Sequence, residues 1–286
     1  MSPARPTVGV VIPVHNGMPF LPQTVATILG QSRRPDELII VENGSTDGTA
    51  EWLAGLDEPG VRVIVQDELV SPAQNWTAAV SAASADFVKL VCADDFLLSH
   101  ALETQSAALM ANPEAVMVAS FRKIVDSAGK VVAARRGLGR LRGEVDGSAA
   151  LKSCALRGVN AFGESAAVMF RRGELQAEMP WDDSLPYVID LDLYGRVVHD
   201  RKVVMLPEVV AAFRISAGAW TRNLSSLQRD HFNRWVSREI DRGHITLSRG
   251  ELIRARTMAA IQAAARRGAY EYALISHKLR HTKTQG

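Results

Sequence analysis

Apolar runs and amphipathic stretches alternate through the first third of the chain. Runs of branched apolar residues predict strands, and they lie at 7–14, 37–41, 61–66 and 86–92. Between the first two runs, Leu21, Val25 and Ile28 recur at helical spacing and predict a helix over 20–31. Further helices are predicted after Asp47 and over 72–83. Strands and helices are therefore expected to follow one another in alternation.

Strands that are apolar on both faces and separated by helices indicate a parallel sheet covered on both sides. Ligands of such sheets bind beyond the carboxyl ends of the strands. Polar pairs stand at three of these ends, namely His15-Asn16, Glu42-Asn43 and Asp94-Asp95. We therefore predict a binding site that is assembled from these pairs.

The second half of the chain has a more mixed pattern. Helices are predicted over 98–110, 147–156 and 189–199, and strands over 115–121, 166–170, 203–206 and 209–215, with a hairpin turn at 125–131. Beyond Leu224 the pattern is helical over 224–240, 250–267 and 270–279. We place a domain boundary near Arg222 and predict an α/β protein with a helical C-terminal extension.

Composition narrows the class of protein. Hydrophobic residues make up 47% and charged residues 22% of the 286 residues, a balance that excludes a disordered chain. No apolar run approaches the roughly 18 residues that cross a bilayer, and the first residues lack the apolar core of a signal peptide. Cys92 and Cys154 alone cannot form a disulfide framework or a zinc site. We therefore expect a cytoplasmic protein.

The net charge of +2 is unevenly distributed along the chain. From Arg222 onward there are 13 Lys and Arg residues against 5 Asp and Glu residues. A basic amphipathic segment can lie on an anionic surface, so peripheral contact with the inner face of the membrane is one interpretation. We favour the alternatives that these helices fold back on the domain or form a homodimer contact. Nucleic-acid binding is not expected, because the basic residues are scattered and no aromatic-rich RNA motif is present.

Asp94 and Asp95 follow an otherwise apolar strand. Adjacent carboxylates at such a place repel each other unless a cation or hydrogen-bond donors compensate. Oxygen ligands suit Mg²⁺ or Mn²⁺, which complete their coordination shell with water and phosphates. The alternative is that one of the two aspartates caps the helix that begins near Leu98. Spacing alone leaves both interpretations open.

Asp190 and Asp192 lie on a helix that otherwise faces the core. Residues two apart on a helix point in different directions, so at most one of them faces a shared cleft. That carboxylate could serve as a general base, and the alternative is a solvated helix start.

Several aromatic residues near these positions have competing interpretations. Trp181 would either stack on an acceptor sugar or belong to the core, and Trp76 is predicted to be a core residue. His199 and His231 are predicted to lie on the surface.

Together these segments resemble family 2 glycosyltransferases. The segments that carry the resemblance, in chain order, are VVIPVHNG (10–17), ELIIVENGSTDGT (37–49), DFVKLVCADDFL (86–97), NAFGESAAVMFRR (160–172), VIDLDLYGRV (188–197) and AAFRIS (211–216). The resemblance covers about residues 6–221. It implies a GT-A fold with a mostly parallel central sheet, a Rossmann-like nucleotide-binding half over 6–97 and an acceptor half over 98–221. Residues 222–286 would form the basic helical extension.

The resemblance implies a donor site in the first half. Pro13, His15, Glu42 and Asn43 would lie along the base and ribose of a nucleotide-sugar, and Asn75 would face the donor from the start of its helix. The family usually has a tyrosine at His15 and paired aspartates at Glu42 and Asn43. UDP is the expected donor nucleotide, with dTDP and GDP as alternatives.

The resemblance also implies the reacting groups. Asp94 would contact the sugar or ribose, and Asp95 would bind the Mn²⁺ or Mg²⁺ ion that bridges the two phosphates. Asp190 stands at the position of the general base, and Arg214 stands near the place where a basic residue approaches the diphosphate. The reaction would be a single displacement with inversion at the anomeric carbon. The family often has a histidine at Ser216, so no further protein ligand for the metal is predicted.

The leading prediction is a metal-dependent inverting glycosyltransferase of the hexosyltransferase type. Its acceptor would be a saccharide or a lipid-linked saccharide in cell-surface glycan assembly. One alternative is a sugar nucleotidyltransferase, which is disfavoured because residues 15–19 contain no Lys or Arg. The other is a degenerate protein that binds a nucleotide or glycan without turnover, which the intact Asp95 and Asp190 disfavour.

Overall fold

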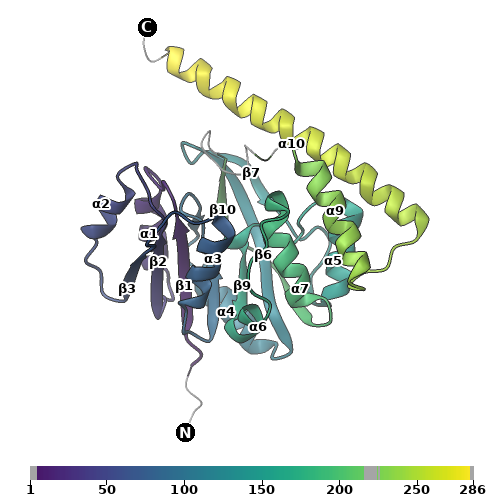
Figure 1. Ribbon diagram of the computed structural model, residues 1–286, viewed down its shortest axis with the longest axis horizontal. Helices are drawn as coiled ribbons and strands as arrows, with labels where there is room; N and C mark the ends of the chain where they lie inside the picture. Colours follow the sequence, from purple (N-terminus) through teal and green to yellow (C-terminus); the bar gives the residue numbers. More distant parts are fainter. Residues whose placement is uncertain (1–4, 216–223, 225, 284–286) are drawn as a thin grey trace.

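The computed structural model describes residues 5–215, 224 and 226–283, which form a central sheet with helices on both faces (Figure 1). The first half has the predicted alternation of elements: β1 (Val8–Val14), α1 (Leu21–Leu29), β2 (Glu37–Glu42), α2 (Thr49–Ala54), β3 (Val61–Val65), α3 (Pro72–Ser81), β4 (Phe87–Leu90), β5 (Phe96–Leu97) and α4 (Ala101–Ala111). The predicted α/β class is confirmed.

The second half contains longer strands and the C-terminal helices. Its elements are β6 (Ala115–Asp126), β7 (Val131–Arg136), β8 (Gly143–Asp146), α5 (Gly147–Arg157), the 3₁₀ helix η1 (Ser165–Ala167), β9 (Val168–Arg171), α6 (Arg172–Ala177), the 3₁₀ helix η2 (Pro186–Val188), α7 (Ile189–Val198), β10 (Lys202–Ile215), α9 (Gln228–Asp241) and α10 (Arg249–Lys283). The predicted boundary near Arg222 lies outside the described residues.

Two expectations for the second half are corrected. The two late strands are one strand, β10, because shifts in register around Leu206 and Val209 bend it without ending its pairing with β6. The last two predicted helices are one helix, α10. The glycine at 268 does not end it, since one helical glycine costs only about 1 kcal/mol.

The sheet has the strand order β3-β2-β1-β4-β9-β6-β10-β5, with β7 paired to β6 and β8 paired to β10. Four of the five strands of the first half, β3, β2, β1 and β4, are parallel neighbours. Strand β9 runs antiparallel between β4 and β6, β6 is parallel to β10, and the short β5 is antiparallel to β10. The four parallel strands of the first half therefore end at one edge of the sheet.

Alternate side chains of the central strands enter two separate hydrophobic clusters. In β1, Val11 packs with residues of α3, α5 and α7. Its neighbours Val10 and Ile12 pack with residues of α1 and α4 on the other face. Each fully buried side chain of this size stabilises the fold by roughly 1.5–3 kcal/mol, which is why strands of this kind read as unbroken apolar runs.

A buried lysine in β4, Lys89, connects this strand to α4 and β9. The ammonium group of Lys89 donates to Gln105 Oε1 at 2.7 Å and to the carbonyl of Val168 at 3.0 Å. Gln105 in turn donates to Ser120 Oγ at 2.9 Å. Burial lowers the pKa of Lys89 to about 7. These bonds tie α4 and β9 to the strand that leads into Asp94.

The C-terminal helices fold back on the body, as the favoured interpretation of this segment predicts. Phe232, Trp235 and Val236 of α9 belong to the same hydrophobic cluster as α7. His231, predicted to lie on the surface, is only 6% exposed, because it is on the same face of α9 as Trp235. Helix α10 lies along α9 and α5, and its C-terminal end extends past the sheet (Figure 1). Membrane contact and a homodimer stay predictions.

Among the described residues, no helix is long and apolar enough to span a membrane.

Gly158 tests how closely α10 is bound to the body. Gly158 and Gly143 both have φ of +67°, so alanine at either position should cost about 1–2 kcal/mol. A Cβ on Gly158 would also lie 2.6 Å from backbone atoms of Met258 and Ala259, whereas nothing lies within 4 Å at Gly143. We expect Gly158→Ala to lose about 1–3 kcal/mol more than Gly143→Ala in urea unfolding. Equal losses would show that α10 does not pack there.

Candidate active site

The polar pairs that follow β1 and β2 contact each other at the edge where the parallel strands end. In the parallel register, Val14 of β1 is paired with Glu42 of β2. His15 Nδ1 lies 2.8 Å from the carbonyl oxygen of Asn43, and the N–H of Asn16 donates to Ser45 Oγ at 2.8 Å. The loops that follow these two strands therefore form one surface.

Glu42 and Asn43 shape this surface through the backbone. The Glu42 carboxylate accepts from the N–H groups of Gly44 and Ser45 at 3.1 and 2.6 Å. The Asn43 side chain donates to the carbonyl of Val70 at 3.0 Å and accepts from its N–H at 2.9 Å. Both side chains are buried. Their polar atoms therefore hold the loops that follow β2 and precede α3.

The other predicted donor residues differ in exposure. Pro13 is buried within β1, and His15 is exposed beyond its end. Asn75 is buried in the first turn of α3, where its amide makes only long contacts of 3.5 Å with the carbonyl of Val41 and with Gln66. His15 is thus the member of this set that faces solvent. The donor-binding roles of these residues stay predictions.

The second aspartate of the acidic pair is deeply buried. Asp95 is 1% exposed, and its Oδ1 accepts from the backbone N–H of Arg214 at 3.0 Å. Its Oδ2 is buried without a hydrogen-bond partner. Burial raises the pKa of Asp95 well above its usual value, and the neighbouring charge of Asp94 adds to the effect. Burial also raises the pKa of Asp94.

A buried carboxylate oxygen without a partner is costly unless a cation or a donor compensates it. Asp95 Oδ2 therefore fits a single carboxylate ligand for Mn²⁺ or Mg²⁺, which prefer oxygen ligands and keep positions for water and phosphate. In the part of the chain that the structure describes, no group of three or more His, Cys, Asp or Glu side chains is arranged to hold a metal.

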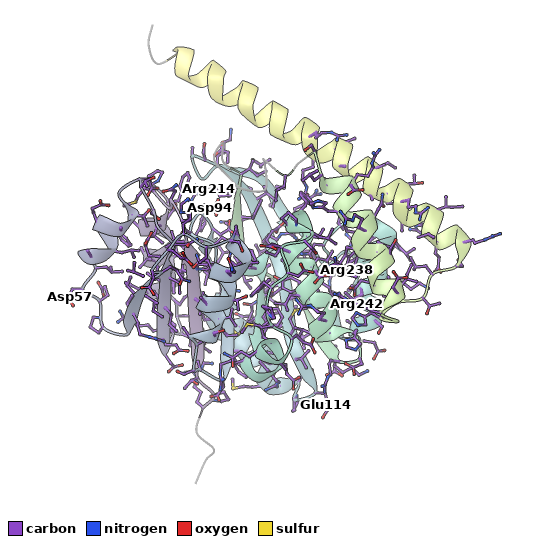
Figure 2. The ribbon with its side chains drawn as sticks, viewed as in Figure 1. Asp57, Asp94, Glu114, Arg214, Arg238 and Arg242 are labelled. Atoms are coloured by element: carbon purple, nitrogen blue, oxygen red, sulfur yellow. The ribbon has the colours of Figure 1, made fainter. Side chains whose placement is uncertain are left out.

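Arg214 lies against the acidic turn rather than free in the site. Its Nε donates to the carbonyl of Asp94 at 2.9 Å, Nη1 to the carbonyl of Ser127 at 3.1 Å and Nη2 to Gln23 Oε1 at 2.6 Å. The guanidinium also lies 4.4 Å from the ring centre of Phe20. Asp94 and Arg214 lie together at the strand-end edge (Figure 2). The geometry supports a positioning role, and contact with a diphosphate stays a prediction.

Asp190 stands at the start of α7. Its Oδ2 accepts from Asn160 Nδ2 at 2.9 Å, and its Oδ1 accepts from the N–H of Leu191 at 2.7 Å. Asn160 is held in turn by the carbonyl of Gly163, to which it donates at 2.8 Å. Burial raises the pKa of Asp190 to about 7, and the charge of Glu164 contributes. An aspartate of this kind can accept a proton near neutral pH.

Cys92 and Glu164 each lie close enough to Asp190 and to the acidic pair for the charges to affect one another. The Cys92 thiol has its pKa raised by burial and by the charges of Asp95, Asp94 and Asp190. The charge of Glu164 raises the pKa of both Asp95 and Asp190. Asp95 and Asp190 are therefore affected by the same neighbouring charge, that of Glu164.

Glu164 and Arg122 are site residues that the sequence analysis did not identify. Arg122 Nη2 donates to Glu164 Oε1 at 2.8 Å, and Nε makes a second, shorter contact with the other oxygen. Burial works to raise the pKa of Glu164, but the charge and hydrogen bonds of Arg122 outweigh it and lower that pKa. One available signal was a charged residue in the middle of the apolar strand 115–126.

Asp192 points away from Asp190, as expected for residues two apart on a helix. It is 1% exposed and accepts from Arg238 and Arg242 of α9 at 3.0 and 3.1 Å. Trp181 is a core residue: it is 4% exposed and packs edge-on against Trp76 with ring centres 4.9 Å apart. Stacking of Trp181 on an acceptor sugar is therefore excluded in this arrangement.

Ligands of open α/β sheets bind beyond the carboxyl ends of the parallel strands, which is where Asp94 and Asp95 lie. The model of glycosyl transferase family 2 matches residues 9–173, more than half of the chain. The chain belongs to this family, and its class is glycosyltransferase.

Similar proteins extend this finding. The uncharacterised protein MT1568 of Mycobacterium tuberculosis is 25% identical over 243 residues, which are 82% of this chain and 75% of that protein. The structure of S. aureus TarS 1-349 with UDP-GlcNAc has a TM-score of 0.63 at 15% identity, over 80% of this chain and 66% of that chain. Mannosyltransferase PcManGT from Pyrobaculum calidifontis, with GDP-Man and Mn²⁺, has a TM-score of 0.61 at 16% identity, over 99% of this chain and 81% of that chain. These likenesses confirm the predicted GT-A fold.

Arg214→Lys tests the contacts that hold the acidic turn. Lysine keeps the charge but cannot reach three separate acceptors, so we expect a loss of about 2–4 kcal/mol in urea unfolding, at about 1 kcal/mol for each hydrogen bond. Arg34→Lys is the matched control, because Arg34 is exposed and makes only a 3.6 Å ion pair with Glu58. The control should change stability by less than about 0.5 kcal/mol. An equally small effect in both variants would contradict the role assigned to Arg214.

Proposed function

We propose that this protein transfers a sugar from a nucleoside-diphosphate sugar to a hydroxyl acceptor by direct displacement, with inversion at the anomeric carbon. The observation that carries the proposal is the buried Oδ2 of Asp95, which lacks a hydrogen-bond partner. It is supported by Asp190, whose pKa is raised to about 7 and which is affected, like Asp95, by the charge of Glu164. A metal-binding carboxylate and a carboxylate base are the two acidic functions that such a displacement requires.

The donor side is assigned to the loops after β1, β2 and β4. TarS has been solved with UDP and UDP-GlcNAc, and PcManGT with GDP-Man. For this chain we infer UDP as the donor nucleotide, with dTDP or GDP as alternatives. His15 would lie against the base, since its ring is exposed and is held by the carbonyl of Asn43.

Asp95 would hold a Mn²⁺ or Mg²⁺ ion, and Asp94 would lie beside it against the sugar or ribose. When bound, such an ion neutralises the charge that develops on a departing diphosphate. Arg214 keeps the turn in place through the N–H that binds Asp95 Oδ1. Because only Oδ1 of Asp95 accepts a hydrogen bond, Oδ2 would be available to the ion.

Asp190 would take the proton from the acceptor hydroxyl. A base with a pKa near the working pH is both ionised and basic enough to be effective. Asn160 and the N–H of Leu191 orient its carboxylate. The acceptor would be a saccharide or a lipid-linked saccharide, and the latter would bring a cytoplasmic protein to the inner face of the membrane.

A thermal-shift screen tests the donor and metal assignments together. Purified protein is heated with UDP, dTDP, GDP, CDP or NAD, each with Mn²⁺ and with EDTA. A ligand at about a hundredfold excess over Kd raises the free energy of unfolding by about 2.7 kcal/mol. We expect stabilisation by one nucleoside diphosphate with Mn²⁺ and little with EDTA.

Asp95→Asn should abolish the Mn²⁺-dependent part of this stabilisation, because the amide is a weaker ligand for a hard cation. Asp57→Asn, at an exposed position, is the control and should respond as the unaltered protein does. Stabilisation by NAD alone would count against the proposal. Binding of donor without transfer or hydrolysis would favour the degenerate-binder alternative.

The pH dependence of transfer tests Asp190. Activity should fall as the pH drops through about 7, because protonated Asp190 cannot accept a proton. Glu164→Gln removes a negative charge that favours the protonated form, so the acidic limb should move to lower pH. The charge of Arg122, which lowers the pKa of Asp190, is retained in this variant. The measurement is kcat/KM for transfer between about pH 5 and about pH 9.

Two other titratable groups near Asp190 do not change charge in this pH range. The Cys92 and Tyr194 groups beside Asp190 have raised pKa values and so stay neutral over this range. The control is Glu114→Gln, an exposed position at the end of the molecule away from Asp94 (Figure 2). A limb that moves equally in both variants, or moves to higher pH in Glu164→Gln, would contradict the assignment of Asp190.

A further inference from the structure

One arginine of the C-terminal helices joins two segments of the acceptor half. Arg238 of α9 donates through Nη1 to Asp182 Oδ2 at 2.9 Å and to Asp192 Oδ1 at 3.0 Å. Its Nη2 donates to Ser184 Oγ at 3.0 Å. Asp182 and Ser184 lie in the segment that leads into η2, and Asp192 lies on α7. Arg238 thus bridges both ends of the stretch that contains Asp190.

Of the residues that Arg238 contacts, Asp192 is the most deeply buried. It is buried, and it also accepts from Arg242 Nη1 at 3.1 Å and lies 3.4 Å from Arg196 Nε. An ion pair in water contributes little, but a carboxylate buried at 1% exposure must keep its partners, because an unpaired buried charge is strongly destabilising. Helix α9 is therefore held against α7 just beyond Asp190.

Helix α9 also covers the 3₁₀ helix that precedes Asp190. His231 Nδ1 lies 3.3 Å from the N–H of Tyr187, which donates to it. Phe232 and Trp235 share a hydrophobic cluster with Val188. The segment that leads to Asp190 is thus packed against α9, and Asn160 holds the Asp190 carboxylate.

We propose that α9 is a positioning element for the acceptor side of the reaction, and that Arg238 fixes the segment 182–188 and α7 in the arrangement that places Asp190. This inference rests on the proposed function. Arg238 would touch no substrate and would act through the backbone of α7. A shift of the base by about 1 Å can reduce turnover by about a hundredfold. Loss of the Arg238 contacts could therefore slow the reaction although Arg238 lies outside the reacting groups.

The test compares Arg238→Ala with Arg234→Ala. Both variants remove the same side chain from α9, but Arg234 is exposed and makes only a 3.8 Å ion pair with Asp230 of its own helix. UDP-GlcNAc and GDP-mannose serve as donors, and p-nitrophenyl glycosides serve as acceptors. We expect kcat/KM for the acceptor to fall about 10- to 100-fold in Arg238→Ala and less than about threefold in Arg234→Ala. Thermal stabilisation by UDP or GDP with Mn²⁺ should be equal in both, since the donor loops lie elsewhere.

Hydrogen exchange supplies a readout that needs no reaction. Amides of the peptides that cover 182–192 should exchange faster in Arg238→Ala than in the unaltered protein, and at the unaltered rate in Arg234→Ala. Unchanged exchange in Arg238→Ala would overturn the inference. Faster exchange with unaltered acceptor kinetics would also overturn it, because the contact would then be structural only.

Asp182→Asn covers the case in which Arg238→Ala does not fold. It weakens the loop end of the bridge and leaves the buried Asp192 pair intact, so acceptor kcat/KM should fall about 3- to 10-fold with donor stabilisation unchanged. Acceptor kinetics equal to those of the unaltered protein would overturn the inference. If the unaltered protein turns over neither donor and no nucleoside diphosphate stabilises it in the thermal-shift screen, the proposed function fails. Hydrogen exchange in Asp182→Asn then still decides whether the bridge holds the segment.

Discussion

The acidic turn after β4 depends on a residue from the far end of the described domain. Arg214 of β10 binds Asp95 through its backbone N–H and the carbonyl of Asp94 through its guanidinium. Two adjacent carboxylates in a buried turn repel each other, and burial disfavours the charge of each. The N–H of Arg214, 119 positions later in the chain, donates a hydrogen bond to Asp95 Oδ1, whereas Asp95 Oδ2 has no hydrogen-bond partner. The same restraint therefore shapes the turn and leaves Asp95 Oδ2 free for the metal ion proposed there.

The remaining charges of the site are balanced across the sheet. Strand β9 lies between β4 and β6, which brings Glu164, just before it, close to Arg122 of β6. That ion pair stands beside Asp190, where Glu164 raises the pKa of the aspartate and Arg122 lowers it. The basicity of Asp190 thus follows from burial and from the strand order of the second half, rather than from its own segment alone.

Helix α7 links the site to the C-terminal helices. Asp190 and Asp192 leave its first turn in different directions, one toward Asn160 and the other toward Arg238 and Arg242. Both aspartates are restrained by partners from other segments, so the start of α7 is fixed on two sides. Helix α9 of the C-terminal extension belongs to the same hydrophobic cluster as α7, the helix that carries the predicted base. The extension is therefore packed on the body and is not a separate unit.

Local pattern by itself determined the alternation of strands and helices in the first half, its parallel strands and the polar pairs at their ends, because the side chains of strands and helices alternate with fixed periods. The segments around Asp94, Asp95 and Asp190 also indicated the family without the structure. Only the tertiary structure decided that Asn43 pairs with the backbone of Val70, that Arg214 supports the acidic turn, and that Glu164, Arg122 and Arg238 surround the helix of Asp190. Those contacts join residues that are far apart in the chain, and no local period records which distant partner a buried charge will find.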